Sequence, residues 1–341
     1  MNVRDDIEEL DLYTHQNYEA VEQANRMEHD MVINNPNMKE LIKVLKRMKD
    51  FDTTCVITGE SGTGKTLLAK YIHKISNRAD KPFININCAS IPNELIESEL
   101  FGYEEGAFTG ANPKGKKGLI HAADKGTILL DEIAELSLKA QAKLLTVLQE
   151  KEFLPIGKTE AIKVDIRVLA TTNKDLRLLV ESGKFREDLY YRLNVIEFYV
   201  PPLRRRREDI FNLVEMFISE FNKKYKVNRS LSPGVYKLFM DYDWPGNIRE
   251  LRHLLERLVV TVDSLIIDTN HLPSSFFSMS NDEKMALEEK ITQKNFDQLI
   301  EEYESLIVNN AYKKHSSSRK LAKYLDISQT RANKLINKYI K

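Results

Sequence analysis

The sequence has few cysteines, no long apolar run and no excess of either charge. Cys55 and Cys88 are its only cysteines; they lack metal-ligand spacing and lie in apolar segments, which predicts two reduced, half-buried thiols in a cytoplasmic protein. No eighteen apolar residues run together and the acidic start has no apolar core, so neither a membrane span nor a signal peptide is expected. The 51 basic residues balance 51 acidic ones, so any site for a polyanion must be local.

A chain of 341 residues predicts two or three domains. Residues 1–30 are acidic with few bulky aliphatics, so we expect a linker helix there, too short to form a sensor domain. In residues 31–200 short apolar runs alternate with helical patterns, which predicts a parallel sheet with helices on both faces. We expect a helical lid subdomain over residues 201–272, a flexible linker over 273–290 and an all-helical domain over 291–341.

Residues 59–66, GESGTGKT, follow the strand pattern TTCVI and precede the helical pattern LLAKYI. This is the spacing of a P-loop, whose glycines let backbone N–H groups point at phosphates. Lys65 is expected to reach the β- and γ-phosphates, and the Thr66 hydroxyl to bind Mg²⁺. The predicted nucleotide ligands are Gly59, Glu60, Ser61, Gly62, Thr63, Gly64, Lys65 and Thr66.

A second strand pattern, GTILLDE, delivers Asp131 and Glu132 at its carboxyl end. Asp131 would hold Mg²⁺, through water, and Glu132 would orient or deprotonate an attacking water. An exposed acidic pair that caps a helix is the alternative, and the order of the two motifs argues against it.

Two further patterns leave alternatives open. VDIRVLATTN places Thr172 and Asn173 at the tip of another buried strand, where they either sense a γ-phosphate or form a turn. In FREDLYYRL, Arg186 and Arg192 are six residues apart. They are either surface arginines paired with neighbouring acids or arginine fingers supplied across a subunit boundary.

The helical pattern in WPGNIRELRHLLER begins with a capping-box-like arrangement of Asn247 and Glu250. This places Arg249 in the first turn, where the helix dipole disfavours a cation, so a nucleotide phosphate or a nearby carboxylate should compensate it. The arginine run at 204–207 is followed directly by two acids, and we interpret it mainly as a solvated entrance to the lid.

In this order, GESGTGKT, SELFGYEEGAFTGA, GTILLDE, FREDLYYRLNV and WPGNIREL resemble the AAA+ ATPases that activate bacterial sigma-54 RNA polymerase, over about residues 30–270. The resemblance implies an α/β AAA+ P-loop NTPase with a helical lid, assembled as a hexameric or similar ring with ATP and Mg²⁺ at subunit interfaces. It also implies that Arg186 and Arg192 act in trans, that Arg249 is a second sensor on the lid, and that Asn87 restrains Glu132. Many members carry an acidic residue where this chain has Thr66.

Residues 102–113, GYEEGAFTGANP, place an aromatic residue among small and flexible ones. Taken alone, the stretch is either a plain turn or a loop that presents its aromatic side chain to a partner. GAFTGA is the signature loop of the family that the chain resembles, and the resemblance implies that it contacts the sigma factor when ATP is bound. The contact residues implied are Gly106, Ala107, Phe108, Thr109, Gly110 and Ala111.

Residues 311–341 contain nine Lys or Arg and one acid, Asp326, so the neutral chain has a basic end. The pattern predicts two helices joined by a short turn, with Ser328 as N-cap of the second. This is helix-turn-helix spacing and resembles the TyrR type, a relative of the Fis-type module; a basic helical hairpin used for packing is the alternative. The residues expected to contact DNA are Gln329, Thr330, Arg331, Asn333 and Lys334.

The leading hypothesis is therefore an ATP-driven activator that binds upstream double-stranded DNA, forms a ring and remodels the sigma-54 RNA polymerase holoenzyme. The alternative is a DNA-binding regulator independent of sigma-54 in which ATP controls oligomerisation. A generic AAA+ remodeller would need neither the GAFTGA loop nor the basic end.

Overall fold

The computed structural model describes residue 31 and residues 33–107, 114–276 and 296–340. The chain divides into two compact units, Met1–Leu272 and Pro273–Lys341. The expected linker helix at 1–30, most of the expected linker at 273–290 and the loop tip from Phe108 to Ala111 lie outside the described residues.

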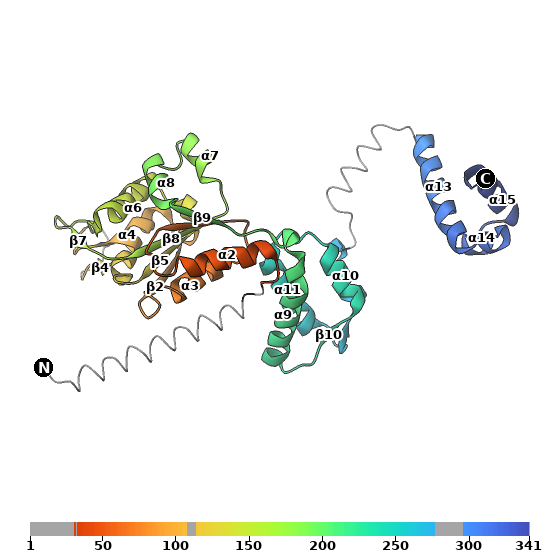
Figure 1. Cartoon of the computed structure of the whole chain (residues 1–341), viewed down its shortest axis with the longest axis horizontal. Helices are drawn as coiled ribbons and strands as arrows, with labels where there is room; N and C mark the ends of the chain where they lie inside the picture. Colours follow the sequence, from red (N-terminus) through yellow and green to blue (C-terminus); the bar gives the residue numbers. More distant parts are fainter. Residues whose placement is uncertain (1–30, 32, 108–113, 277–295, 341) are drawn as a thin grey trace. The chain divides into compact units, whose positions relative to one another are not determined.

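The first unit is built on a five-stranded parallel sheet with the strand order β2, β5, β8, β1, β9 (Figure 1). This confirms the parallel sheet that the alternating sequence pattern predicts. The strands are β1 (Cys55–Thr58), β2 (Phe83–Asn87), β5 (Thr127–Asp131), β8 (Arg167–Thr172) and β9 (Ile196–Tyr199).

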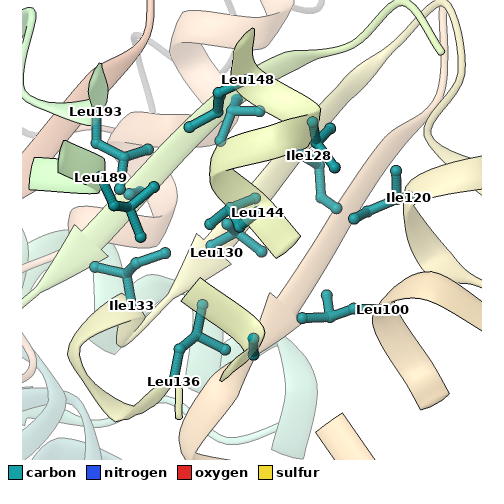
Figure 2. Packing of buried hydrophobic residues seen from close by; sticks show 14 of the residues in the cluster. Leu100, Ile120, Ile128, Leu130, Ile133, Leu136, Leu144, Leu148, Leu189 and Leu193 are labelled. Carbon is teal, nitrogen blue, oxygen red and sulfur yellow. The ribbon is translucent and has the colours of Figure 1, made fainter. Parts of the chain in front are cut away.

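Helices cover both faces of this sheet because successive strand residues point to opposite sides. In β8, Val168 and Ala170 pack in the same cluster as residues of α4, α6 and α8, whereas Leu169 packs with residues of α2 and α3. Figure 2 shows the first cluster, in which Leu189 and Leu193 of α8 lie beside residues of α6. The helices are α2 (Pro36–Arg47), α3 (Lys65–Lys74), α4 (Asn93–Phe101), α5 (Leu119–Ala122), α6 (Leu138–Glu150), α7 (Leu176–Glu181) and α8 (Glu187–Leu193).

Short elements complete this part of the unit. Two antiparallel hairpins project from it, one before and one after α6. They pair β3 (Gly102–Tyr103) with β4 (Lys116–Lys117) and β6 (Glu152–Phe153) with β7 (Ile162–Lys163). Single 3₁₀ turns follow β2 at Cys88–Ser90 and β5 at Ile133–Glu135.

A helical lid follows β9, as the sequence predicts. β9 ends at Tyr199, and Val200 and the Pro201–Pro202 pair follow. Proline has no N–H group to donate to a sheet ladder, so the strand does not continue. Within the lid, α9 packs against α11. The lid elements are α9 (Ile210–Tyr225), β10 (Ser230–Leu231), α10 (Pro233–Asp241), α11 (Asn247–Thr261) and β11 (Ile266–Ile267), with 3₁₀ turns at Leu203–Arg205, Arg207–Asp209, Thr269–His271 and Ser274–Phe276.

The second unit contains α13 (Phe296–Lys314), α14 (Ser318–Tyr324) and α15 (Gln329–Tyr339). Val308 and Ala311 of α13 pack against Leu321, Ala332 and Ile336 of the two following helices. Ser328 accepts a hydrogen bond from the Arg331 N–H and caps α15, as expected.

The two cysteines differ from expectation in one respect. Both are free thiols, but they are buried rather than half-buried, with exposed fractions of 1% and 2% for Cys55 and Cys88. Burial raises the pKa of both thiols, that of Cys88 to about 12, so thiolate chemistry is disfavoured. Among the described residues no helix is both long and apolar enough to cross a bilayer.

Candidate nucleotide site

The P-loop joins the carboxyl end of β1 to the N-terminus of α3, at the sheet edge where ligands bind in open α/β folds. Gly62 has φ of +78°, and a Cβ there would lie 2.4 Å from the Gly246 carbonyl oxygen, so only glycine fits. Gly64 has φ of +98° and open space where a Cβ would point, and no side chain caps the helix that follows it. The first N–H groups of α3 are thus free of any side-chain cap and can bind an anion.

Lys65 begins α3 and lies inside this loop. Its side chain is 6% exposed, and its Nζ donates to the carbonyl oxygens of Gly59 at 2.8 Å and Glu60 at 3.0 Å. Burial lowers the pKa of Lys65, while the nearby carboxylates Glu132 and Asp131 oppose that shift. A cation is therefore held among backbone oxygens at the point where phosphates would enter.

Asp131 ends β5 and meets the first turn of α3. The Thr66 hydroxyl donates to Asp131 Oδ2 at 3.1 Å, and the Thr171 hydroxyl of β8 donates to Asp131 Oδ1. Mg²⁺ prefers oxygen ligands and keeps several waters, so the Thr66 hydroxyl and the Asp131 carboxylate would be suitable groups to hold it. The predicted pair for Mg²⁺ is brought together.

Glu132 follows directly in a left-handed conformation, with φ of 56° and ψ of 51°. Its N–H donates to Thr171 Oγ1 at 3.3 Å, which fixes the backbone at the end of the strand. Asn87 ends the neighbouring strand β2 and lies opposite Asp131 in register. Its side-chain oxygen accepts from the Ala89 N–H at 3.0 Å, so only its amide NH₂ is left to reach Glu132.

The two polar residues at the carboxyl end of β8, Thr172 and Asn173, lie in different surroundings. Thr172 is buried and its hydroxyl accepts from the Lys174 N–H at 3.0 Å, as in a turn. Asn173 is exposed and borders a polar cavity that Gly59 and Glu60 also line. Asn173 is therefore placed beside the start of the P-loop.

Arg186 directly precedes α8 as its N-cap residue, and Arg192 lies in the last turn of this helix. Arg186 caps the N-terminus and forms a two-pronged ion pair with Asp188 at 2.6 and 3.0 Å, the surface pairing that the sequence allowed. Arg192 is exposed and donates to the Leu148 carbonyl oxygen at 3.0 Å. A role across a subunit boundary stays a prediction for both residues.

Arg249 lies in the first turn of α11, as expected, and contacts a hydroxyl rather than a carboxylate. Its NH1 donates to the Ser61 hydroxyl at 2.9 Å, which brings the lid cation onto the P-loop. The capping-box expectation is right only for Glu250, whose Oε2 accepts from the Gly246 N–H at 2.8 Å. It is wrong for Asn247, because Gly246 is the N-cap and no side chain caps the helix from that position. The Asn247 amide instead donates to Glu60 Oε2 at 3.2 Å and to the Ser61 carbonyl oxygen at 3.0 Å.

The arginine run at 204–207 is more than a solvated entrance, so that interpretation is wrong in part. Arg204 forms a two-pronged pair with Glu60 at 2.5 and 2.8 Å, and this hydrogen bonding lowers the pKa of Glu60. Arg206 is 3% exposed and donates to the Thr63 carbonyl oxygen at 2.6 Å. Two arginines of this run therefore hold the lid to the P-loop, one at Glu60 and one at Thr63.

Asp209 lies close to Arg206 and is fully buried. Its Oδ1 accepts from the backbone N–H groups of Asn34 at 2.6 Å and Asn35 at 3.0 Å, which ties the segment before α2 to the lid. Burial raises the pKa of Asp209 and lowers that of Arg206, and the attraction between their charges opposes both shifts.

A cavity of about 600 Å³ opens beside the P-loop, between the segment before α2, α9 and α11. Its walls are mainly apolar, which suits a flat heterocyclic base attached to phosphates held by Gly62, Thr63 and Gly64. Sequence patterns do not predict this cavity, because its walls come from several segments that lie far apart in the chain. The apolar residues that line it are Met31, Ile33, Met38, Leu67, Leu68, Val200, Leu213, Met216, Phe217 and Ile248.

The GAFTGA segment, residues 106–111, lies between β3 and β4 in the sequence. Gly106 and Ala107 are described; Gly106 has φ of +72°, and a Cβ on Gly157 would approach the Ala107 Cβ to 3.0 Å. The residues expected to form the contact tip, Phe108, Thr109, Gly110 and Ala111, lie outside the described residues.

The residues expected to contact DNA lie together near the start of α15 in the second unit. All five lie in the N-terminal half of α15 and are exposed. The only ion pair described for them joins Arg331 to Glu304 at 3.9 Å. These residues are Gln329, Thr330, Arg331, Asn333 and Lys334.

Comparison with known proteins agrees with this geometry. Residues 31–199 match the sigma-54 interaction domain and residues 204–289 match the AAA+ ATPase lid domain. The regulatory protein AtoC of Escherichia coli K12 is 48% identical over 244 residues, which cover 71% of this chain and 53% of AtoC. An uncharacterized protein in the HyuA 5' region of Pseudomonas sp. strain NS671 is 41% identical over 296 residues, 87% of this chain and all of that protein.

The fold also has solved counterparts. The structure of NtrX from Brucella abortus in complex with ADP superimposes with a TM-score of 0.69 and 27% identity, over 97% of this chain and 75% of that one. The chain spans about half the length of regulatory relatives such as AtoC. The matched domains, in this order and on this fold, show that the chain belongs to the family of sigma-54-dependent transcriptional regulators.

Proposed function

We propose that this chain is an ATP-hydrolysing transcriptional activator that binds upstream DNA, assembles into a hexameric ring and remodels the sigma-54 RNA polymerase holoenzyme. The observation that carries the proposal is the convergence of Lys65, Thr66, Asp131 and Glu132 at one edge of the parallel sheet. A separate basic helical unit and a family domain for sigma-54 interaction support the choice of partners.

In this proposal the P-loop N–H groups and Lys65 bind the phosphates of ATP, and the apolar cavity holds its base. Mg²⁺, held by Thr66 and Asp131, supplies charge neutralisation on the phosphates. Glu132 orients or deprotonates the attacking water, and Asn173 senses the γ-phosphate. The complex of the relative NtrX with ADP supports nucleotide binding on this fold.

Charges outside the P-loop complete the site in the proposal. Arg249 moves from Ser61 to the phosphates when they are present, a change that costs only one exposed hydrogen bond. Asn87 restrains Glu132 through its amide NH₂. Arg186 and Arg192 stabilise the transition-state charge on ATP bound by the next subunit, for which Arg186 must leave its exposed pair with Asp188.

Nucleotide state is coupled to partner contact through residues 106–111. Phe108 and Thr109 form the tip that touches the sigma factor, and Gly106 and Gly110 give the loop its freedom. In the second unit Gln329, Thr330, Arg331 and Asn333 read the major groove and Lys334 contacts phosphate. The proposed parts are a linker at 1–30, the ATPase subdomain at 31–200, the lid at 201–272, a joint at 273–290 and the DNA-binding domain at 291–341, in a cytoplasmic protein.

The experiment is capture of purified sigma-54 in ADP with aluminium fluoride, which mimics the transferring phosphoryl group. Wild-type chain should form a stable complex and Phe108→Ala should not, while both hydrolyse ATP. Phe51→Ala, which changes a phenylalanine that is 61% exposed before β1, is the matched control and should behave as wild type. If no complex forms although ATPase activity and DNA binding are intact, the chain is the ATP-controlled, sigma-54-independent regulator instead.

A further inference from the structure

Helix α8 and its N-cap residue provide the two arginines that are proposed to act on ATP bound by the next subunit, Arg186 and Arg192. Some hydrogen bonds of this helix, however, connect it to the chain's own nucleotide site. Its apolar side, with Leu189 and Leu193, packs in the core beside Leu144 and Leu148 of α6 (Figure 2). Besides the contacts of Arg192 with Leu148 and Thr54, hydrogen bonds hold this segment at two further places. Neither place is used by the proposed chemistry.

The first place is Gln141 on α6, which is fully buried. Its amide donates to the carbonyl oxygens of Leu136 at 2.8 Å and Lys184 at 3.1 Å, and its oxygen accepts from the Arg186 N–H at 2.8 Å. Leu136 directly follows the 3₁₀ turn that begins after Glu132. One side chain therefore links the segment after the proposed catalytic carboxylate to the backbone of the first arginine.

The second place is the Tyr190 hydroxyl, in the middle of α8. It accepts from Arg177 Nε at 2.9 Å and from Asn194 Nδ2 at 3.0 Å, and Tyr190 is only 8% exposed. Arg177 lies in the first turn of α7, which begins three residues after Asn173. The hydroxyl therefore connects the arginine-bearing helix to the loop that carries the proposed γ-phosphate sensor.

The groups of the second place, Tyr190, Arg177 and Asn194, line a cavity of about 540 Å³ that also reaches the P-loop. Gly59 and Asn173 line it together with Tyr190 and Asn194. Glu197 extends the chain of contacts, because it accepts from the Thr58 hydroxyl at 3.0 Å and from Asn194 Nδ2 at 3.5 Å. Both ends of the proposed phosphate site, Thr58–Gly59 and Asn173, thus have polar routes to α8.

We propose that Tyr190 is a positioning residue that makes the placement of Arg186 and Arg192 depend on whether the chain's own nucleotide site is occupied. The inference rests on the proposed ring ATPase. Phosphate contacts at Asn173 move the loop before α7. The hydrogen bond between Arg177 and the Tyr190 hydroxyl transmits this movement to α8. Because α8 has only seven residues, it moves as a rigid unit. The ATP bound by one subunit then determines where that subunit places Arg186 and Arg192 in the nucleotide site of the next subunit.

The first test compares Tyr190→Phe with Tyr191→Phe, the same change one residue later on a side chain that is 69% exposed. Loss of a hydroxyl shared by two donors should lower kcat for ATP about three- to tenfold, while ADP affinity changes less than about twofold. Tyr191→Phe should match wild type. Arg177→Ala should lower kcat similarly, and its combination with Tyr190→Phe should lower it no further. Unchanged kcat, or equal loss of ADP binding, overturns the proposal.

The second test mixes Tyr190→Phe chains with an excess of donor chains that have native α8 but do not hydrolyse ATP. Glu132→Gln donors, which retain ATP, should restore the rate per Tyr190→Phe site, because occupied donors place their arginines correctly. Lys65→Ala donors, which should bind no nucleotide, are expected to restore this rate much less. Cross-linking serves as the control that these donors still enter rings. Equal rescue by both donors reduces Tyr190 to a structural support, and no rescue by either places its effect in its own site; both results overturn the proposal.

The failure of this inference is distinguishable from failure of the proposed function. If the wild-type chain shows no ATPase activity at any concentration, the ring ATPase itself is wrong. If the wild type hydrolyses ATP and only the Tyr190 and donor results differ from expectation, the link through α8 alone is wrong.

Discussion

The nucleotide site and the α15 surface both depend on basic residues, but the structure holds those residues in opposite ways. Lys65 and Arg206 are 6% and 3% exposed and donate to backbone carbonyl oxygens. Arg331 has a side chain that is 65% exposed and lies 3.9 Å from its acidic neighbour. Charges of the first kind are part of the fold, whereas charges of the second kind are available to a ligand at little structural cost.

The largest effect that sharpens this comparison is expected from Glu132→Gln. The amide cannot accept a proton from water, so hydrolysis should fall by about 100-fold or more, while ATP binding is retained because Lys65 and Thr66 are unchanged. Steady-state phosphate release and binding of a fluorescent ATP analogue measure the two properties. Glu150→Gln at the end of α6 is the matched control, and a similar loss in that variant would remove the special role of Glu132.

Arg206→Ala tests whether a charge at the nucleotide site is truly part of the fold. It removes a charged donor to the buried Thr63 carbonyl oxygen, which should lower the free energy of unfolding by about 1.5–3 kcal/mol. Arg205→Ala, an exposed neighbour in the same run, should change it by less than about 0.5 kcal/mol. Urea unfolding measures both, and equal values would contradict the assignment of Arg206 to the core.

These neighbouring arginines show why sequence reasoning reached only part of the site. The P-loop and the Asp131–Glu132 strand were predictable because a strand, a turn and a helix N-terminus are encoded by adjacent residues. The burial of Arg206 was not predictable, because this side chain is held by the carbonyl oxygen of Thr63, which lies far away in the sequence. Asn247 shows the same limit: its local pattern fits a helix cap, but contacts with the P-loop prevail.

The fold was predictable for the same reason. Alternation of apolar runs with helical patterns encodes a parallel sheet, and the structure confirms the sheet and the lid. The apolar cavity was not predictable, since Met31, Phe217 and Ile248 come from three segments whose meeting is a property of tertiary packing. The roles of the site residues remain predictions that the variants described here test.

On the α15 surface, Arg331→Ala should weaken DNA binding without loss of stability. Removal of one base or phosphate contact costs about 1–3 kcal/mol, or about five- to 150-fold in affinity. A duplex selected from random sequences by the wild-type chain serves as probe. Lys237→Ala on α10 removes the same charge elsewhere and should bind as wild type. Loss of affinity together with a lowered Tm in Arg331→Ala would show that the two regions do not differ as described.

The smallest effect is expected at the pair that joins the lid to the P-loop, Glu60 and Arg204. Its side chains are 39% and 37% exposed, so solvent screens the pair and its contribution should be below about 1 kcal/mol. Hydrogen bonding from Arg204 lowers the folded-state pKa of Glu60 below its ordinary value of 4.5, so its contribution is present above about pH 4.5. It is lost as the pH falls through the lowered folded-state value, where Glu60 is protonated in both states. Glu60→Gln should therefore be less stable than wild type towards urea at pH 7, and this difference in the free energy of unfolding should shrink as the pH falls below 4.5. Equal stabilities of Glu60→Gln and wild type at both pH values would mean that the lid is held to the P-loop by other contacts, such as that of Arg206 with the Thr63 carbonyl oxygen, and not by this exposed ion pair.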